Sequence, residues 1–295
     1  MSKLRILLIG KNGQLGWEFQ RTLACLGEVT VLDWPELDLA QPEAVRRAVK
    51  RVHPQVIVNA AAYTAVDRAE SEPDKARTIN ATAPGVLAEE ARASGAALIH
   101  YSTDYVFDGQ KSGSYGEEDE PNPLNLYGSS KLEGEKQVSS VGEAYWILRT
   151  SWVYSDRRDS FVNKVLEWSR SQKQMRVVSD QMGCPTWSRM LAEITTQALA
   201  IGLKDPVGWI GETAGVYHLA GDGGTSRYQF AHEILRLDPL REQQVVTELI
   251  EAQTSDFPTP ARRPLNAVLD CSKFKSVFGM SLPPWREALE LMLKR

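Results

Sequence analysis

The sequence predicts an α/β fold with a doubly wound parallel sheet, followed by a smaller C-terminal region. In the first half of the chain, short apolar or β-branched runs alternate with longer segments of helical spacing. The apolar runs are nearly continuous, which is typical of parallel strands whose two faces are both covered by helices. A glycine-rich segment, 10–16, lies between the first strand and the first helix. This position indicates a ligand site, because open parallel sheets bind ligands at the carboxyl ends of their strands.

The predicted strands and helices alternate along the chain. The first strand is 4–9, and the helix 14–26 follows it with apolar residues at the spacing of one helical face: Leu15, Phe19, Leu23 and Leu26. Apolar runs predict further strands at 29–32, 56–59, 97–101 and 146–149. Helical patterns predict further helices at 42–52, at 78–94 and from about residue 127.

The composition and the pattern of the sequence change after about residue 154. Trp, Pro and Gly become frequent, and helical patterns at 160–172, 226–237 and 284–294 are separated by long loops. Long loops in a compact chain are usually functional or mobile. We therefore expect a first domain at 1–155, rejoined by part of 173–200, and a region at 156–295 that mainly binds the substrate.

Composition and charge exclude several classes of protein. Lys and Arg number 34 against 38 Asp and Glu, which gives a formal net charge of −4, whereas nucleic-acid-binding domains usually carry a basic patch. No apolar run approaches the roughly 20 residues that span a bilayer, and the start of the chain lacks a signal-peptide pattern. Cys25, Cys184 and Cys271 are too widely spaced for a disulfide framework or a zinc pair. We expect a cytoplasmic protein with neither nucleic-acid nor membrane partners.

The glycine-rich segment carries the first chemical signal. Gly10, Gly13 and Gly16 are spaced by three residues and open a helix. Glycines there allow a tight turn and a close approach of the backbone to a ligand, and the N–H groups and dipole of a helix start favour a pyrophosphate. The pattern predicts that the first domain, of the Rossmann type, binds a dinucleotide. It is not a Walker loop, because Gly-Lys-Ser/Thr is absent.

Two residues point in opposite directions on the choice of dinucleotide. Asp33 ends the second predicted strand, where an acidic residue typically binds a ribose 2′-hydroxyl, repels a 2′-phosphate and so favours NAD. Lys11 lies inside the glycine loop, where its positive charge would attract that phosphate and favour NADP. The residues alone leave both cofactors open.

The strongest constellation lies further along the chain. Tyr127 and Lys131 are four residues apart, on one face of a predicted helix. A cation beside a phenol favours the phenolate, so we expect Lys131 to lower the pKa of Tyr127 from about 10 and make it a usable general acid. Thr103 lies at the end of a predicted parallel strand, where its hydroxyl can bond a substrate oxygen.

Together, the glycine loop, Thr103 and the Tyr127/Lys131 pair resemble the extended short-chain dehydrogenases/reductases that act on nucleotide sugars. Within this family, further segments are similar to the reductases that complete the synthesis of dTDP-L-rhamnose. These segments are 59–70, 102–109, 149–154, 180–186 and 262–264. The resemblance implies NAD(P)H-dependent reduction of the C4 ketone of dTDP-4-dehydro-L-rhamnose, and it favours NADPH slightly over NADH.

The resemblance also assigns roles to residues. Tyr127 would protonate the C4 oxygen, Lys131 would lower its pKa and hold the nicotinamide ribose, and Thr103 would bond the same carbonyl. Substrate contacts would come from Thr103, Asp104, Tyr127 and Trp152, with the indole of Trp152 as a platform for the sugar. Further cofactor contacts would come from Asn12, Gly13, Gln14, Leu15, Asp38, Leu39, Ala61, Ala62 and Tyr63. Asn80 would support the site through backbone and water contacts.

Several alternatives stay open at this point. A nucleotide-sugar 4-epimerase uses the same Tyr/Lys pair but keeps its cofactor bound, whereas a dehydratase would need Asp-Glu after its Thr, and here Asp104 precedes Tyr105. A non-catalytic relative, like the regulatory β subunit of methionine adenosyltransferase, would act by binding a partner enzyme. Members of the family have been described with Mg²⁺, but no carboxylate cluster in the sequence demands a metal. A homodimer is a further candidate assembly. Arg262 and Arg263 are candidates both for the substrate diphosphate and for surface ion pairs.

Overall fold

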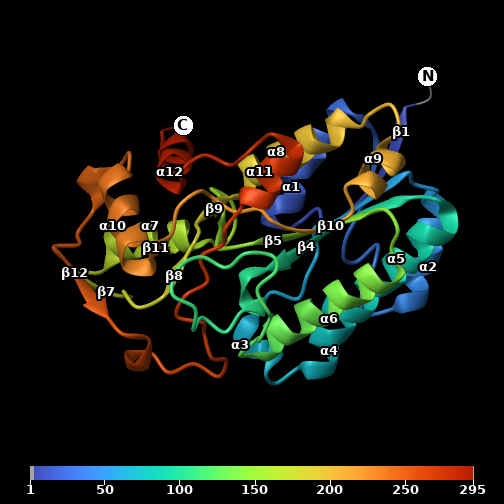
Figure 1. Ribbon diagram of the computed structural model, residues 1–295. Helices are drawn as coiled ribbons and strands as arrows, with labels where there is room; N and C mark the ends of the chain where they lie inside the picture. The colour runs from blue at the N-terminus through green and yellow to red at the C-terminus, as the bar shows by residue number, and fades with distance from the viewer. Residues whose placement is uncertain (1–2, 295) are drawn as a thin grey trace.

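A six-stranded parallel sheet forms the centre of the molecule in the computed structural model, which describes residues 3–294 (Figure 1). From one edge to the other its strands are β10 (Gly215–His218), β5 (Tyr145–Thr150), β4 (Ala97–Thr103), β3 (Val56–Asn59), β1 (Leu4–Ile9) and β2 (Gly27–Leu32). All the pairings in this sheet are parallel. After β2 the chain returns to the other side of β1 to form β3, so the topology switches direction between β1 and β3. The predicted doubly wound α/β class is confirmed.

Helices cover both faces of this sheet (Figure 1). The helices on one face are α1 (Gln14–Thr22), α8 (Ser188–Ile201), α9 (Pro206–Glu212) and α11 (Ser272–Phe278). The helices on the other face are α2 (Pro42–Val52), α5 (Ala83–Ser94) and α6 (Leu126–Val141). In β1, Ile6 and Leu8 join the first apolar layer, and Leu7 and Ile9 join the second. Burial on both sides explains why the strand is an uninterrupted apolar run.

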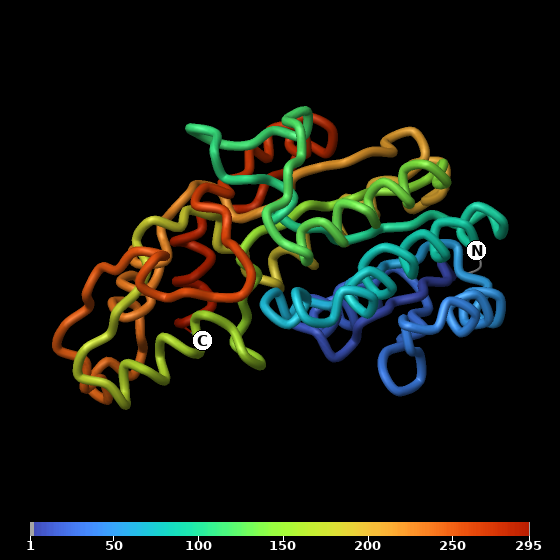
Figure 2. The backbone as a smooth tube through the Cα atoms, turned by 90° about the horizontal axis from the view of Figure 1, so that it is seen from below, coloured from blue at the N-terminus to red at the C-terminus, as the bar shows by residue number. Residues whose placement is uncertain are grey.

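The remaining elements form a smaller lobe beside the sheet (Figure 2). Its helices are α7 (Phe161–Ser171), α10 (Arg227–Leu237) and α12 (Trp285–Leu293), and β7 (Gln174–Val178) pairs in parallel with β12 (Glu248–Ala252). These elements enclose an apolar cluster of their own, around Val165, Phe230 and Leu289. Two-residue strands connect the lobe to the rest: β6 (Val153–Tyr154) with β9 (Thr186–Trp187), and β8 (Met182–Gly183) with β11 (Thr225–Ser226).

The chain crosses the boundary expected at residue 155 more than once. Helix α8 packs against α1, and β10 extends the sheet beyond β5, so both return to the first domain from the second half of the chain (Figure 2). Helix α8 lies partly within the segment 173–200 that the sequence predicts to return, whereas β10 and α11 lie beyond it. We propose a dinucleotide-binding domain of 1–155 to which 188–218 and 272–278 also belong.

The predicted helix at 78–94 begins earlier and is irregular. Helix α4 (Pro73–Arg77) continues through a π-helical turn, Thr78–Thr82, into α5. The helix predicted at 14–26 ends at Thr22 and continues as a 3₁₀ turn, Leu23–Cys25. The other short elements are the helix α3 (Val66–Ala69) and 3₁₀ turns at Asp104–Val106, Arg241–Gln243 and Thr254–Asp256. Among residues 3–294, no helix is both long and apolar enough to cross a membrane.

Candidate active site

A cavity of about 990 Å³ opens at the carboxyl edge of the sheet, where the topology switches between β1 and β3. The segments that follow β1 to β5 all contribute to its wall. This is the position that ligands take in open α/β sheets, and the volume lies at the upper end of the range usual for small-molecule sites. The predicted site residues that line it are Gly10, Asn12, Gly13, Gln14, Leu15, Asp33, Ala61, Ala62, Thr103, Asp104, Tyr127, Lys131 and Trp152.

The glycine loop places backbone where side chains would not fit. Gly10 has φ +97°, and a Cβ there would lie 2.8 Å from the backbone nitrogen of Ala61. A Cβ on Gly16 would lie 2.0 Å from the carbonyl oxygen of Gly10, so this glycine brings α1 close to the end of β1. Gly13, at the N-cap of α1, offers no side-chain cap. The first N–H groups of the helix are therefore not capped by that side chain and are available for an anionic ligand.

Two polar atoms in the cavity wall fit a bound dinucleotide. Gln14 Oε1 and Thr150 Oγ1 are buried and have no hydrogen-bond partner in the described structure. Buried polar atoms without a partner are uncommon and indicate a missing ligand or water. Sequence reasoning missed Thr150, although its place at the end of β5 could have identified it. Trp34 and Thr64 also line the cavity and were not predicted.

Asp33 and Lys11 take different positions at the loop. Asp33 Oδ2 accepts a hydrogen bond from the backbone N–H of Asn12 at 2.8 Å, and Asp33 lines the cavity. Lys11 does not line it, and its Nζ pairs with Glu36 at 2.7 Å. The acidic residue is therefore built into the glycine loop, whereas the lysine charge is already paired beside it.

Four of the predicted cofactor residues are not in the cavity wall: Gly16, Asp38, Leu39 and Tyr63. Asp38 caps the backbone N–H of Ala40 and Leu39 is buried in the second apolar layer. The hydroxyl of Tyr63 donates to Glu72 at 3.0 Å. The structure therefore shows supporting contacts for these side chains, and their contacts with a cofactor stay a prediction.

Asn80 joins two segments that carry site residues. It lies in the π-helical turn, where its Oδ1 accepts from the backbone N–H of Tyr63 at 2.8 Å and its Nδ2 donates to the carbonyl of Tyr63 at 3.1 Å. The same Nδ2 donates to Ser130 Oγ on α6 at 3.0 Å. Asn80 thus fixes the loop after β3 against the helix that bears Tyr127 and Lys131.

Thr103, Asp104 and Ser151 form one hydrogen-bonded chain beside Tyr127. The hydroxyl of Thr103, which interacts with Tyr127, donates to Asp104 Oδ1 at 2.9 Å. Ser151 Oγ donates to the other carboxylate oxygen at 2.7 Å. Burial raises the pKa of Asp104 to about 6, against the effect of these two hydrogen bonds. Because both oxygens are engaged, Asp104 holds the Thr103 hydroxyl in place.

Lys131 is buried one turn after Tyr127 but is bonded elsewhere. Its Nζ donates to the carbonyl of Tyr101 at 2.5 Å and lies 3.3 Å from Nε2 of His100. Burial raises the pKa of Tyr127, and hydrogen bonding to Thr103 opposes that effect. Burial also lowers the pKa of Lys131 to about 8, opposed by the charge of Glu135. The predicted lowering of the Tyr127 pKa by Lys131 is therefore wrong for this arrangement, because desolvation dominates.

Trp152 lines the cavity just after β5, and its indole packs against the apolar cluster of the smaller lobe. Its backbone is left-handed at φ +43°. The guanidinium of Arg227 lies 3.6 Å from the ring centroid, and a Cβ on Gly183 would lie 2.4 Å from the ring. The indole that the sequence predicts as a substrate platform therefore has the guanidinium of Arg227 stacked on one of its faces.

We expect Trp152→Ala to lower kcat/KM about tenfold, a loss of about 1.4 kcal/mol in transition-state stabilisation, while the melting temperature changes little. Steady-state kinetics and thermal melting of one purified variant measure both quantities. Trp209→Ala, which removes a half-buried indole remote from the cavity on α9, should lower stability without changing KM. If Trp152→Ala instead costs about 3 to 5 kcal/mol of stability with KM unchanged, the indole belongs to the core.

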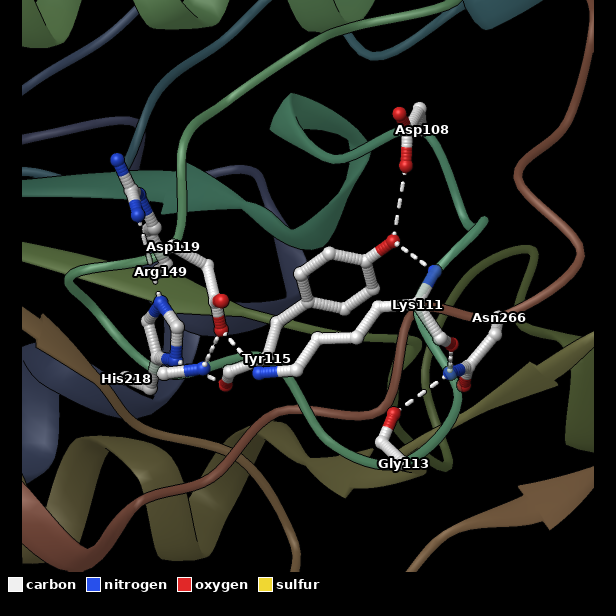
Figure 3. Close-up of polar contacts among 9 residues, drawn as sticks. Asp108, Lys111, Gly113, Tyr115, Asp119, Arg149, His218 and Asn266 are labelled. Carbon is white, nitrogen blue, oxygen red and sulfur yellow. Dashed lines mark hydrogen bonds and ion pairs between the residues drawn. The ribbon is translucent and has the colours of Figure 1, made fainter.

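A second polar network holds the loop that follows β4 (Figure 3). The hydroxyl of Tyr115 donates to Asp108 Oδ1 at 2.9 Å, and its carbonyl accepts from Nδ1 of His218 at 3.0 Å. Nε2 of that ring faces the guanidinium of Arg149, on β5, at 3.4 Å. Since Nδ1 donates to a carbonyl, Nε2 is the acceptor for Arg149. This network ties the segment after Thr103 to β5 and β10.

The described residues offer little support for a metal ion or for Arg263 as a free diphosphate ligand. Within residues 3–294, no group of three or more His, Cys, Asp and Glu side chains is arranged to hold a metal ion. Arg263 pairs with Asp67 at 2.8 Å and is mostly covered, while Arg262 is exposed. The structure therefore places Arg263 in an ion pair beside α3.

The glycine cradle at the switch point and the Tyr127/Lys131/Thr103 set are typical of the short-chain dehydrogenase/reductase class of NAD(P)-dependent oxidoreductases. The family model described as "RmlD substrate binding domain" matches residues 4–295, and the chain belongs to that family. A dTDP-4-dehydrorhamnose reductase from Burkholderia thailandensis is 43% identical over 99% of this chain and 98% of its own length. The enzyme of the same name from Escherichia coli K12 is 40% identical over 98% and 97%.

Solved structures agree with this assignment. A dTDP-4-dehydrorhamnose reductase from Clostridium acetobutylicum is 36% identical, with a TM-score of 0.88 over 98% of both chains. The Bacillus anthracis enzyme, solved in complex with NADP, is 31% identical, with a TM-score of 0.89 over 99% of both chains. A UDP-glucose 4-epimerase from Thermus thermophilus, at 21% identity and a TM-score of 0.78, shares the fold.

Proposed function

We propose that the protein reduces the C4 ketone of dTDP-4-dehydro-L-rhamnose to the alcohol of dTDP-L-rhamnose, with NADPH or NADH as reductant. The observation that carries this proposal is that Tyr127, Thr103 and Lys131 all line the large cavity, with Lys131 one helical turn after Tyr127. A phenol and a hydroxyl that converge on one point can both donate to the same carbonyl oxygen. The full-length likeness to curated reductases of this sugar nucleotide gives the substrate class.

Each residue has a separate task in this reaction. The bound dinucleotide supplies a hydride to C4 of the sugar. Tyr127 gives its hydroxyl proton to the C4 oxygen, and Thr103 donates a hydrogen bond to that oxygen, which stabilises the developing negative charge. The Thr103 hydroxyl donates to Asp104 in the structure, so it would turn from that carboxylate to the C4 oxygen when the substrate binds. Lys131, one turn along α6, would stabilise the Tyr127 phenolate when its side chain is in the ammonium form.

The dinucleotide would lie across the start of α1. The uncapped N–H groups after Gly13 would bind its pyrophosphate, and Asp33 would face the adenosine ribose at the end of β2. Gln14 and Thr150 would use their unpaired oxygens on the same ligand. We also propose that the protein works in the cytoplasm and that it forms a homodimer. Sedimentation of the purified chain would test the homodimer.

The direct test is incubation with dTDP-4-dehydro-L-rhamnose and each reduced cofactor, following the loss of absorbance of the reduced nicotinamide. One mole of cofactor oxidised per mole of dTDP-L-rhamnose formed supports the proposal. Interconversion of C4 epimers without net oxidation would make the protein an epimerase. Co-purification with a synthetase and no turnover would make it a regulatory subunit instead.

The cofactor preference should respond to the charge of Asp33. Asp33→Asn removes the negative charge and keeps one of the two side-chain oxygens, which accept from the backbone N–H groups of Asn12 and Trp34 at 2.8 Å each. We expect the ratio of kcat/KM for NADPH to that for NADH to rise about three- to tenfold, as repulsion of the 2′-phosphate is lost. Glu28→Gln, an exposed charge change at the other end of β2, is the matched control. An unchanged ratio for Asp33→Asn would place the adenosine ribose elsewhere.

A further inference from the structure

A buried histidine lies directly against the lysine of the site. His100 on β4 is fully buried, as is Asn59 beside it on β3. Asn59 Nδ2 lies 3.1 Å from His100 Nδ1, and His100 Nε2 lies 3.3 Å from Lys131 Nζ. The three side chains therefore form one line from the middle of the sheet to the cavity wall.

The direction of these hydrogen bonds is fixed from the Asn59 end. Asn59 Oδ1 accepts from the backbone N–H of Ala61 at 3.2 Å. The amide therefore presents its NH₂ group, a donor, to Nδ1 of His100. A neutral imidazole that accepts at Nδ1 carries its proton on Nε2. Turning the amide over would face its NH₂ to the N–H of Ala61, which would set two donors against each other and leave that partly buried backbone N–H without its acceptor.

The N–H of His100 thus faces the Nζ of Lys131. An ammonium can only donate, so it would set two donors against each other across 3.3 Å, whereas a neutral amine accepts from Nε2–H and still donates to the carbonyl of Tyr101. We propose that His100, oriented by Asn59, is a positioning residue that controls whether Lys131 carries its extra proton. This inference rests on the proposed function for its catalytic meaning, but its geometry stands without it.

The second buried histidine shows the opposite arrangement. Nδ1 of His218 donates to the carbonyl of Tyr115, so its Nε2 is free to accept from Arg149. A buried histidine next to a cation therefore adopts the accepting tautomer where its other partner is a carbonyl. His100 cannot do so, because its other partner is an amide donor.

The other groups around Lys131 either favour or disfavour its charged form. Glu135, one turn further on α6, favours the ammonium, but its carboxylate is bonded to Arg149 on β5 and to Ser102 on β4. Burial acts against the ammonium and is the largest effect on the pKa of Lys131. On the cavity side lies Tyr127, which stays protonated because burial raises its pKa. Among the described residues of β3, only Asn59 makes a side-chain hydrogen bond to His100 or Lys131.

Two substitutions of Asn59 exchange the donor and acceptor roles of the two ring nitrogens of His100. In Asn59→Asp, the carboxylate accepts from Ala61 N–H and from Nδ1–H of His100, so Nε2 becomes an acceptor for the Lys131 ammonium. In Asn59→Leu, of similar volume, the donor to Nδ1 is removed without adding a charge, which also frees the accepting tautomer. We expect the titration midpoint of Lys131 to rise by about one pH unit in the first variant and by a smaller amount in the second.

The midpoint is measured by NMR of protein labelled with ¹³Cε-lysine, with the Lys131 signal assigned from Lys131→Met. This readout needs no turnover, so it remains valid if the proposed reaction fails. The alkaline limb of the pH profile of kcat should move in the same direction. Asn59→Asp in a His100→Phe background should lose most of the rise, because only the ring transmits it.

Three outcomes would overturn the proposal. One is an unchanged Lys131 midpoint in either folded Asn59 variant. Another is a midpoint that falls. The third is an equal rise in the His100→Phe background, which would show that the introduced carboxylate acts through space and that the ring has no part. If Asn59→Asp does not fold, Asn59→Leu alone decides between these results.

Discussion

Tyr127→Phe should lower kcat by about 10² to 10⁴ while cofactor binding stays intact, because removal of a positioned general acid has an effect of that size. The substitution removes one oxygen and leaves the ring, which packs edge-on against Tyr105 at 5.8 Å between centroids. Thr103 remains as a donor to the ketone oxygen, so residual activity above the uncatalysed rate is expected. Single-turnover absorbance and cofactor titration by fluorescence measure the two quantities separately.

The neighbouring ring offers a matched control for this variant. Tyr105→Phe removes the hydroxyl of the adjacent ring, which has no part in the proposed proton transfer, and should leave kcat within about threefold of wild type. A Tyr127→Phe variant that keeps half of the wild-type kcat would exclude Tyr127 as the proton donor.

The second large effect concerns stability. Glu135 and Arg149 form an ion pair with side chains that are each 4% exposed, with Arg149 Nη2 donating to Glu135 Oε2 at 2.7 Å and Nε to Oε1 at 3.0 Å. Glu135→Gln leaves the guanidinium of Arg149 buried without a countercharge. We expect a loss of about 3 to 5 kcal/mol in the free energy of unfolding, measured by denaturant titration with circular dichroism.

Two further variants separate the missing charge from other causes. Replacing both partners, Glu135→Met with Arg149→Met, should recover most of the loss, since a buried pair exchanged for apolar side chains of similar volume is often near neutral. Glu89→Gln breaks the pair with Arg46 at 2.7 Å on the surface and should change stability by less than about 1 kcal/mol. If Glu135→Gln is as mild as Glu89→Gln, the buried pair has no special weight.

The sequence predicted the sheet better than the parts that complete it. The strands β1, β3, β4 and β5 are largely buried on both faces, and this burial imposes the apolar runs from which they were predicted. Strand β2 lies at the edge and is mostly half-buried, but its β-branched run was sufficient to predict it. Strand β10 has four residues, and its edge position leaves half of them only partly covered, so no run marks it. The π-helical turn at Thr78–Thr82 also has no signal in the sequence, because it depends on contacts of Asn80 with two other segments.

The cavity wall was predictable where it follows strand ends and not where it depends on side-chain partners. Thr103, Asp104 and Trp152 follow β4 and β5, and all three line the cavity as expected. That Asp104 accepts from Ser151, or that Lys131 faces His100, follows from packing between elements far apart in the chain. Spacing along one helix predicts that Tyr127 and Lys131 are neighbours, but it cannot predict the burial that sets their pKa values.

The return of β10 to the sheet constrains how such a chain can evolve and be cut. Its parallel pairing with β5 and the packing of α8 on α1 mean that the half ending near residue 155 would expose an unpaired strand edge and an uncovered apolar helix face. A single crossover near residue 155 therefore cannot exchange the smaller lobe between relatives as an independent module. Such an exchange would need several junctions, in the loops on either side of α8–β10 and of α11. Substrate preference in this family can thus change by substitutions within the lobe more readily than by shuffling of whole segments.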